Sequence, residues 1–287
     1  MNGLLLINKE QGMTSHDVVA KVRRLLNTKR IGHLGTLDPN ATGVLVLCIG
    51  EACKLVPFLE NDNKEYIAEV ILGIDTNTYD ITGEIVKSKD VDIEKINLSE
   101  ILTSFLGQQQ QLPPIYSAIK VNGKKLYQYA RNDENVEIKP RDIIINSIEY
   151  VEPVKYENGY NRFKIKVDVS KGTYIRSLCH DIGIKLGCYA TMGELIRTRS
   201  GKFCISDAIK ISDLSLENIE LISMLDAIDY PKVEITTEDM LKKITNGMNI
   251  TLNNFEESSL VAFTHNQRLL AIYEQRGKEM VARRVWN

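Results

Sequence analysis

The sequence predicts an α+β fold, in which a mixed α/β sheet domain is followed by a small β-rich module. Segments with the pattern of strands are separated by individual helical segments and do not alternate with them regularly. The chain has neither a glycine-rich phosphate loop nor a dinucleotide-binding fingerprint, which argues against a doubly wound nucleotide-binding fold. The composition changes near Tyr230-Pro231, where the β-rich module is expected to begin.

The N-terminal region predicts a strand, a helix, a loop and a second strand. A short apolar run opens the chain, and Thr14 with Asp17 forms a capping-box pattern that begins a helix. Apolar residues at positions 18, 19, 22, 25 and 26 fall on one face of that helix. The apolar run from Val44 to Ile49 predicts a buried strand.

The middle of the chain predicts further strands and helices. Residues 64–74 and 162–170 alternate apolar and polar side chains, as half-buried strands do. Residues 92–106 and 174–186 have helical patterns. Gly187 stands just after the second of these, where a helix often ends.

Two segments are expected to lie outside the main sheet. Residues 112–141 open on two prolines, are rich in Lys, Asn and Gly, and close on Lys-Pro-Arg, which predicts an excursion from the sheet. In the β-rich module the pattern predicts a short helix over 237–244 and strands over 260–264, 269–274 and 280–286.

The composition is that of a soluble globular protein, with 43% apolar and 26% charged residues among 287. No apolar run approaches the length of a membrane span, and we expect no membrane association. The five cysteines contain no Cys-x-x-Cys pair, which predicts reduced thiols in the cytoplasm and neither a zinc site nor a disulfide framework. Cys179-His180 is the one Cys/His adjacency, and sequence neighbours rarely ligate one metal together.

The charge distribution matters more than the net charge. A net charge of −2 argues mildly against a nucleic-acid partner, because such affinity depends largely on neutralising phosphates. Lysines and arginines nevertheless cluster over residues 21–30, 120–131, 197–202 and 276–284, whereas acidic residues concentrate over 207–239. This segregation predicts a basic face and an acidic back.

The loop that carries Asp38 is the most informative segment. Pro39 restricts Asp38 to extended or turn backbone, and the flanking glycines permit sharp turns and the close approach of a large ligand. A buried strand after the loop would hold one side chain still. These residues fit a catalytic carboxylate and a plain Asp-Pro turn equally well.

The order His-Leu-Gly-Thr-Leu-Asp-Pro-x-Ala-x-Gly-Val-Leu, over residues 33–45, closely resembles the catalytic-aspartate motif of the TruB family of tRNA pseudouridine-55 synthases. Four further segments resemble motifs of that family, and the resemblance runs from about residue 3 to 203. They are Lys64-x-Tyr66 with residues 73–83, residues 113–131, residues 172–178 and residues 195–201. Asn77 stands where the second motif has Asp.

The resemblance implies a domain organisation. It predicts a pseudouridine synthase catalytic domain over residues 1–230 with a central, mostly antiparallel sheet. Residues 112–141 would form its thumb insertion, which clamps the RNA loop. Residues 231–287 would form a small PUA-like RNA-binding domain, an assignment that rests on position more than on motif.

The implied reaction converts uridine to pseudouridine at position 55 in the T loop of tRNA. The base must be flipped out, its N-glycosidic bond broken and the base rejoined through C5. Nothing is oxidised, hydrolysed or transferred, so neither a cofactor nor a metal is expected. One carboxylate can attack the sugar, attack the base or deprotonate the sugar, and the sequence leaves these three routes open.

The resemblance assigns catalytic roles to Asp38, Tyr66 and Arg176. Arg176 would orient the carboxylate, because an adjacent guanidinium favours its charged form. Tyr66 would stack on the extruded uracil and offer a hydroxyl for proton transfer. Without the resemblance, Arg176 also fits a surface arginine before a helix, and Tyr66 a core tyrosine.

Five further residues are expected to contact the substrate. By resemblance, His33 fills the space left by the flipped base, and Lys54 holds a phosphate or supports the loop. Leu195 would pack against the base, and Lys120 and Arg131 of the thumb would contact the RNA. Taken alone, His33 fits a structural histidine and Lys54 an ordinary exposed lysine.

Two other functions compete with the isomerase. A non-catalytic RNA-binding or RNA-folding module would not need Asp38, Tyr66 and Arg176 together. The guide-RNA-dependent relatives typically carry terminal extensions, whereas here the motif-bearing part starts at Gly3. We therefore expect a cytoplasmic, monomeric enzyme that binds the T-arm stem-loop of tRNA without an obligatory protein partner.

Overall fold

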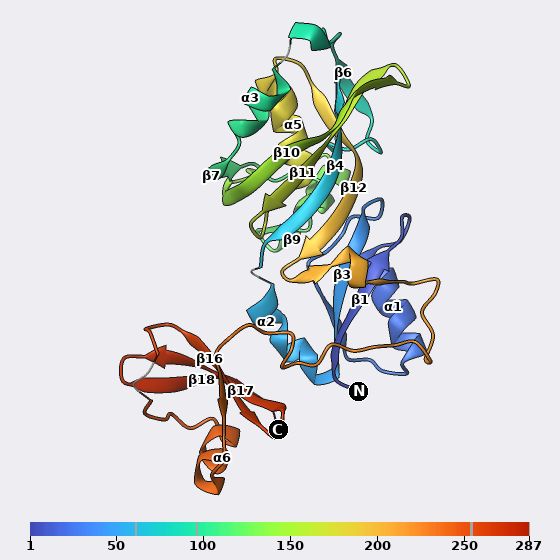
Figure 1. The fold of residues 1–287 in the computed structure, drawn as a ribbon. Coiled ribbons are helices and arrows are strands. Elements are labelled where there is room, and N and C mark those ends of the chain that lie inside the picture. Colours follow the sequence, from blue (N-terminus) through green and yellow to red (C-terminus); the bar gives the residue numbers. More distant parts are fainter. Residues whose placement is uncertain (61, 96, 253–254, 287) are drawn as a thin grey trace.

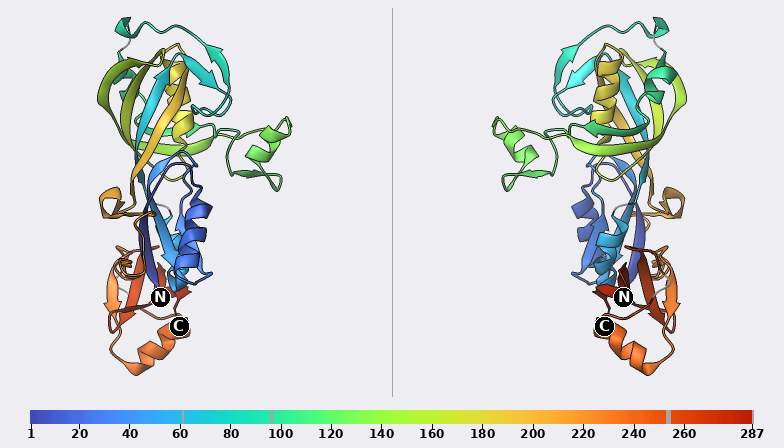
Figure 2. Two further views of the ribbon diagram at one scale, coloured as in Figure 1. Left: turned by 90° about the vertical axis from the view of Figure 1, so that its right-hand side faces the viewer. Right: turned by 90° about the vertical axis from the view of Figure 1, so that its left-hand side faces the viewer.

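The computed structural model describes residues 1–60, 62–95, 97–252 and 255–286. Its fold is α+β: a long mixed sheet carries helices on one side, and a smaller sheet stands at one end (Figures 1 and 2). No helix among these residues is long and apolar enough to cross a membrane.

The main sheet has ten strands and is mostly antiparallel, as expected. Its order is β14-β1-β3-β12-β4-β11-β10-β7, with β2 added beside β3 and β13 beside β12. Of the pairings described, β1 with β14 and β3 with β12 are parallel. The strands are β1 (Gly3–Lys9), β2 (Ile31–Leu34), β3 (Thr42–Ile49), β4 (Lys64–Leu72), β7 (Gly107–Gln111), β10 (Arg141–Glu157), β11 (Tyr160–Val169), β12 (Ala190–Ser200), β13 (Phe203–Cys204) and β14 (Ile209–Lys210).

The helices lie where local signals begin and end them. The capping box is confirmed, because the Thr14 side chain accepts from the Asp17 amide and the Asp17 carboxylate accepts from the Thr14 amide. Gly187 follows α5 with a positive φ of 70°. The helices are α1 (Ser15–Leu25), α2 (Val56–Leu59), α3 (Leu98–Thr103), α4 (Leu126–Arg131), α5 (Ile175–Lys185) and α6 (Glu238–Thr245), with the 3₁₀ turns η1 (Gly50–Leu55), η2 (Ile93–Lys95) and η3 (Ile205–Asp207).

The prediction of a single helix over residues 92–106 is wrong, because the helical parts of this segment are shorter and separate. The segment holds only η2 and the short α3, and residue 96 lies outside the described residues. Asn97 begins α3 anew, because its side chain accepts a hydrogen bond from the Glu100 amide. Gly107, at a φ of 88°, then leads the chain into β7.

Six strands of the main sheet were not predicted: the short β2, β13 and β14, and the strands β7, β10 and β12, none of which shows a clean period of two. β7 reads Gly-Gln-Gln-Gln-Gln and has no apolar side chain. β10 and β12 each contain register shifts, which interrupt the alternation of buried and exposed positions. β10 is also exposed over most of its second half.

Residues 112–140 form the excursion from the sheet that the sequence pattern predicts, and we call this segment the thumb. It leaves at the end of β7 and returns at the start of β10, where Gln111 and Arg141 are paired. It contains the hairpin β8 (Lys120–Val121) and β9 (Lys124–Lys125) and helix α4. It projects away from the body on the side of the sheet that carries α1 and α5 (green in Figure 2).

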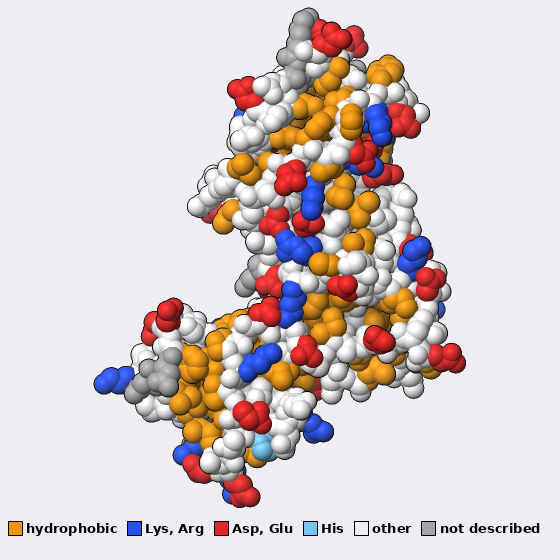
Figure 3. All heavy atoms as spheres, in the orientation of Figure 1, with side chains coloured by type: hydrophobic (Ala, Val, Ile, Leu, Met, Phe, Trp, Pro, Cys, Tyr) orange, Lys and Arg blue, Asp and Glu red, His pale blue; other side chains and the backbone are white. Residues whose placement is uncertain are grey.

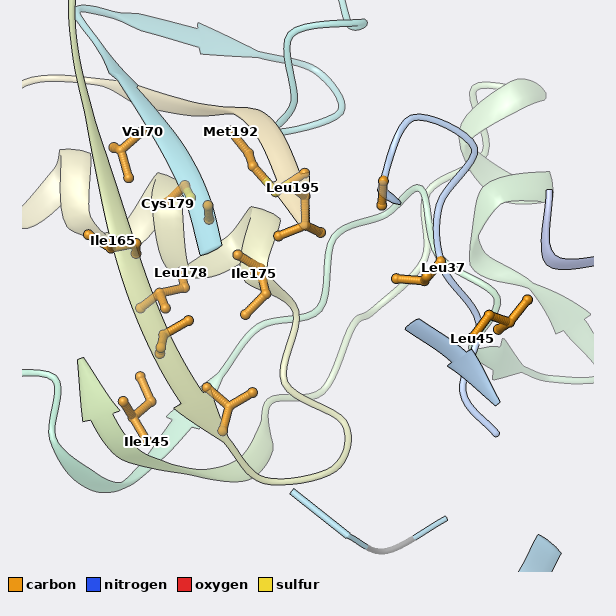
Figure 4. Packing of buried hydrophobic residues seen from close by; sticks show 14 of the residues in the cluster. Leu37, Leu45, Val70, Ile145, Ile165, Ile175, Leu178, Cys179, Met192 and Leu195 are labelled. Atoms are coloured by element: carbon orange, nitrogen blue, oxygen red, sulfur yellow. The ribbon is translucent and has the colours of Figure 1, made fainter. Parts of the chain in front are cut away.

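Two hydrophobic cores occupy the two faces of the sheet at β1 and β3. Alternate side chains of these strands point to opposite faces, so Leu5 and Ile7 pack under α1 while Leu4 and Leu6 pack on the other side. The first core continues to α5, where Leu178 and Cys179 face strands β4 and β11 (Figure 4). Most of its members are fully buried.

The C-terminal module is a four-stranded sheet in the order β15-β16-β17-β18, with α6 beside it. Its strands are β15 (Lys232–Glu234), β16 (Leu260–His265), β17 (Arg268–Arg276) and β18 (Glu279–Val285). The predicted helix and three predicted strands are confirmed to within about two residues at each end. The module has its own core around Phe263 and Tyr273, yet Ile272 and Trp286 belong to the core on the second face of β1 and β3.

The thumb lies behind the sheet in the view of Figure 1, so Figure 3 shows the face opposite to it. Acidic and basic side chains are interspersed on that face, and it is not uniformly acidic (Figure 3). The predicted acidic back is therefore not found there.

Candidate active site

The Asp38 loop connects β2 to β3 and is held at several points by buried side chains. Arg197 donates from Nε to the Val44 carbonyl at 2.8 Å and from Nη2 to the Gly35 carbonyl at 3.2 Å. Ser15 accepts a hydrogen bond from the Leu37 amide at 2.9 Å. The loop is therefore a fixed support rather than a free turn.

A second cation, Lys9, holds the loop from the other side. Its ammonium donates to the carbonyls of Glu10, Met13 and Pro39 at 3.0, 2.7 and 3.0 Å, and its side chain is fully buried. Burial lowers the pKa of Lys9, and the negative charge of Asp38 opposes that change. Lys9 thus fixes the backbone directly after Asp38 and places a positive charge near the carboxylate.

Asp38 itself forms an ion pair with Arg176, as predicted. The Arg176 Nε lies 3.0 Å from the Asp38 Oδ2. The arginine side chain is 7% exposed and the aspartate 44%, so the cation is buried while the carboxylate faces open space. The terminal nitrogens of Arg176 donate to the carbonyls of Thr78 at 3.3 Å and Tyr116 at 3.1 Å, which leaves the guanidinium little freedom.

A cavity of about 490 Å³ opens beside this ion pair. Strand β4 contributes Tyr66 and strand β12 contributes Leu195, while the thumb contributes Tyr116 and Tyr127. Leu195 also packs in the main core with Ile175 and Leu37, which line the same cavity (Figure 4). The cavity therefore combines the Asp38–Arg176 ion pair with aromatic faces and an apolar wall.

The cavity is also lined by basic residues to which no role at the site was assigned from the sequence. Arg141 stands at the base of the thumb, and Lys171 precedes the loop that leads to α5. Lys64 is buried, and its ammonium donates to the Glu60 carbonyl at 2.8 Å and to the Asp62 carbonyl. Burial lowers the pKa of Lys64 to about 8. This wall suits a phosphate or another anionic group.

The other predicted substrate residues lie at different distances from the cavity. Lys120 and Arg131 are exposed on the thumb, and the Arg131 guanidinium lies 5.4 Å from the centre of the Tyr127 ring. His33 lies on β2 with its ring edge against His16, and it does not line the cavity. Burial is the main cause that lowers the pKa of His33.

Lys54 is not brought to the cavity. It lies in η1, pairs with Glu51 at 2.7 Å and donates to the carbonyl of Val285 at 3.4 Å. Trp286 donates from its indole nitrogen to the Glu51 carbonyl at 3.1 Å. These contacts place Lys54 where the C-terminal module meets the main sheet, and its predicted role with the substrate stays a prediction.

Lys9 and Arg197, which hold the Asp38 loop, were likewise not assigned to the site from the sequence. The alternation in β1 carried a usable signal, because Leu5, Ile7 and Lys9 share one face and the first two are buried. Arg197 lies in the segment 195–201 that resembles a family motif, but no period marked it as buried, since β12 was not predicted as a strand. The backbones of Gly43 and Arg197 approach each other closely, because a Cβ added at Gly43 would lie 2.2 Å from the Arg197 carbonyl oxygen.

A pH-dependent effect is expected at Asp181, which lies on α5. Burial raises the pKa of Asp181 from 3.8 to about 6. At pH 7 the carboxylate is ionised in both the folded and the unfolded chain, and its burial costs stability; below pH 4 it is protonated in both, and the cost disappears. Asp181→Asn should raise the free energy of unfolding at pH 7 by about 1–2 kcal/mol after allowance for solvent screening.

Urea unfolding of Asp181→Asn and of the parent chain, from pH 4 to pH 7.5, measures this effect. The gain should shrink as the pH falls from 6 to 4. Asp213→Asn, at an exposed carboxylate, serves as the control. A gain that is constant over this pH range would contradict the assignment to burial of the charge.

Among the described residues, no group of three or more His, Cys, Asp or Glu side chains could hold a metal ion. His180, the histidine of the Cys179-His180 pair, instead lies against Asp75.

Comparisons with known proteins agree with the sequence motifs. The model of the TruB family pseudouridylate synthase N-terminal domain matches residues 23–175, and that of the tRNA pseudouridylate synthase B C-terminal domain matches residues 176–228. The chain is 43% identical to tRNA pseudouridine synthase B of Bacillus pumilus (strain SAFR-032), over 95% of this chain and 93% of that protein. It is 42% identical to the protein of the same name from Bacillus subtilis (strain 168), again over 95% and 93%.

Solved structures give the same fold. A chain of a Cbf5-Nop10-Gar1 complex superposes with a TM-score of 0.73 at 27% identity, over 99% of this chain and 84% of that chain. A chain of an H/ACA RNP bound to a substrate RNA containing 2'-deoxyuridine also gives 0.73, at 26% identity over 99% and 85%.

Proposed function

The chain belongs to the TruB family of pseudouridylate synthases, and from this premise we propose that it isomerises uridine to pseudouridine at position 55 in the T loop of tRNA. Its relatives named tRNA pseudouridine synthase B support an isomerase that acts on tRNA. The observation that carries the site assignment is the Asp38–Arg176 ion pair, which borders a cavity large enough for a nucleotide.

Asp38 is the catalytic carboxylate of this proposal. Arg176 binds its Oδ2 and keeps it oriented, while the exposed remainder of the side chain is available to the flipped nucleotide. Lys9 and Arg197 fix the loop on both sides of Asp38, so that its position does not depend on the substrate. The three routes for the carboxylate, at the sugar or at the base, are all compatible with this arrangement.

Tyr66 and Leu195 form the walls against which the uracil would lie. Tyr66 is partly buried and packs on the core, yet it lines the cavity, so its ring is fixed and still accessible. Its face suits stacking with an extruded base, and its hydroxyl suits proton transfer at C5. Flipping the uracil out of the T loop costs stacking energy, and the contacts with Tyr66 and Leu195 would offset that cost.

The thumb and the basic wall of the cavity would hold the RNA around the flipped nucleotide. Lys120 and Arg131 lie on the thumb, and Arg141 at its base. Contacts between such basic side chains and phosphates fix the position of the RNA on the protein. The shape of the single-stranded loop is what the protein recognises. We assign residues 1–230 to the catalytic domain and residues 231–287 to a PUA-like RNA-binding module.

The protein is expected to act in the cytoplasm, as a monomer and without an obligatory protein partner, cofactor or metal ion. Purified protein incubated with an unmodified tRNA transcript should form pseudouridine at position 55 alone, with no guide RNA added. Mapping of pseudouridine along the transcript measures this. Absence of product would favour a non-catalytic RNA-binding role, and product that appears only with a guide RNA would favour a guide-dependent enzyme.

The C-terminal module is expected to touch phosphates outside the T loop. Arg276 and Arg283 both pair with Glu274, so the exposed Lys278 and Arg284 are the better probes. The double substitution of Lys278 and Arg284 by Gln should raise KM for full-length tRNA, lower the salt slope of binding by roughly one to two, and leave kcat unchanged.

An isolated T-arm stem-loop should not respond to this double substitution, because it lacks the distant phosphates. Point substitutions are preferable to deletion of the module, since deletion would remove Ile272 and Trp286 from a core shared with β1 and β3. An equal loss on the stem-loop and on full-length tRNA would contradict the expected division of labour.

A further inference from the structure

Helix α5 presents two side chains to the loop that follows β5 (Ile74–Thr76), which pairs with β6 (Ile85–Ser88). Arg176 and His180 lie one helical turn apart, so they share a face of the helix. Arg176 donates to the Thr78 carbonyl at 3.3 Å and lies 3.7 Å from the Asp80 carboxylate. His180 contacts the same loop one turn further along the helix.

The His180 contact is a stack on Tyr79. The two ring centroids lie 4.0 Å apart, and the rings are inclined by 19°. Tyr79 has a φ of 61°, a left-handed conformation that is costly for a residue with a bulky side chain. Such a residue persists only where its surroundings hold it, and such strain is characteristic of functional sites.

His180 also lies against a buried carboxylate. Its Nδ1 is 3.2 Å from the Asp75 Oδ1, and the two side chains are 17% and 8% exposed. Neither atom has a hydrogen-bond partner of good geometry among the described residues. The 3.2 Å distance nevertheless shows that Asp75 packs directly against His180 on the helix.

The segment between Asp75 and Asp80 is therefore fixed at several points. The Thr76 hydroxyl donates to the Asp80 carbonyl at 2.8 Å, and the Tyr79 carbonyl accepts from the Met192 amide at 3.0 Å. This segment supplies two of the groups that surround the Arg176 guanidinium, the Thr78 carbonyl and the Asp80 carboxylate. A loss of the clamp at Tyr79 and Asp75 would let both groups move.

We propose that His180 is a positioning residue of the active site. By clamping Tyr79 and Asp75 to α5, it fixes the groups that orient Arg176 and, through Arg176, the Asp38 carboxylate. The positioning role of His180 rests on the proposed function, because its effect is measured on pseudouridine formation. His180 itself does not line the cavity beside Asp38 and Arg176.

His180→Ala is the direct test, with Ile184→Ala as the matched control. Ile184 lies one further turn along α5 and is 54% exposed, outside the clamp. In single-turnover assays on a T-arm stem-loop, His180→Ala should lower the rate at saturation roughly 10- to 100-fold and change RNA affinity less than two-fold. Ile184→Ala should match the parent chain. A well-folded His180→Ala variant with the parent rate would overturn the proposal.

A double-substitution cycle separates positioning through Arg176 from general loosening of the fold. Arg176→Lys keeps the positive charge but loses the planar fork that reaches the two carbonyls. If His180 acts through Arg176, adding His180→Ala to Arg176→Lys should slow the reaction less than three-fold further. If the rate of the double variant instead falls by the product of the two single-variant losses, His180 acts by a route that does not pass through Arg176.

Hydrogen exchange of the RNA-free protein tests the clamp without the reaction. Amides of residues 75–83 should exchange at least ten-fold faster in His180→Ala than in the parent and in Ile184→Ala. If the parent chain forms no pseudouridine, the proposed function fails, and this measurement still decides whether the clamp exists. Unchanged exchange in this segment would overturn the inference even if the enzyme is active.

Discussion

Asp38→Asn is expected to abolish pseudouridine formation while leaving tRNA affinity within a few-fold of the parent value. The amide nearly conserves the shape of the carboxylate and removes its negative charge, which all three chemical routes require. Binding should persist, because contacts to phosphates dominate affinity and lie elsewhere. The loop should also persist, since Lys9, Ser15 and Arg197 hold its backbone and not the Asp38 side chain.

Single-turnover assays and filter binding on the same stem-loop separate the two quantities. The rate should fall by at least roughly 10³-fold, the loss typical of removing a group that acts in the transition state. Asp207→Asn, at an exposed carboxylate in η3, is the control and should behave as the parent chain. A parallel loss of binding and rate in Asp38→Asn would mean that Asp38 is structural.

Arg197→Ala is expected to lower both stability and activity. The side chain is 1% exposed, and its removal would leave the carbonyls of Val44 and Gly35 without their donors and open a large cavity. Losses of this kind cost about 3–5 kcal/mol in the free energy of unfolding. The Asp38 loop would lose its anchor on β12, so the rate should fall even at temperatures where the variant is folded.

Two variants sharpen this experiment. Arg197→Met restores most of the volume without the hydrogen bonds, so it should recover part of the stability but little of the activity. Arg199→Ala removes an arginine two positions along the same strand, which is 30% exposed and pairs with Asp168. It should cost less than about 1 kcal/mol. Chemical unfolding together with single-turnover rates measures both effects, and an Arg197→Ala variant as stable and active as the parent would refute the role of the anchor.

The fold was predictable from sequence wherever a local period was strong. α1 begins at its capping box, α5 ends just before Gly187, and β4 and β11 alternate as half-buried strands do. The C-terminal strands were found for the same reason. The short β2, β13 and β14 were not predicted, and neither were β7, β10 and β12, because a strand of glutamines and two strands with register shifts carry no regular pattern. Their place is decided by neighbours that are distant in sequence.

The catalytic pair shows the same division. The residues around Asp38 predicted a loop that could carry a catalytic carboxylate, and the resemblance to the TruB family predicted that Arg176 would accompany it. The 3.0 Å contact between residues 138 positions apart in the chain arises only when β3, β12 and α5 are assembled. The roles of Asp38, Tyr66 and Arg176 in the reaction stay predictions until the variants are measured.

The sequence by itself determined the family, the order of the elements that it predicted, and Asp38 and Arg176 as the polar groups of the site. Motifs and local periods depend only on short stretches of chain, so they can be recognised without the fold. Only the tertiary structure decided which cations hold the Asp38 loop and that His180 lies on Tyr79. It also placed Lys54 beside Val285 rather than at the cavity. Those outcomes depend on burial and on contacts between strands far apart in sequence, and a single buried lysine or arginine looks like any other in the chain until its neighbours are known.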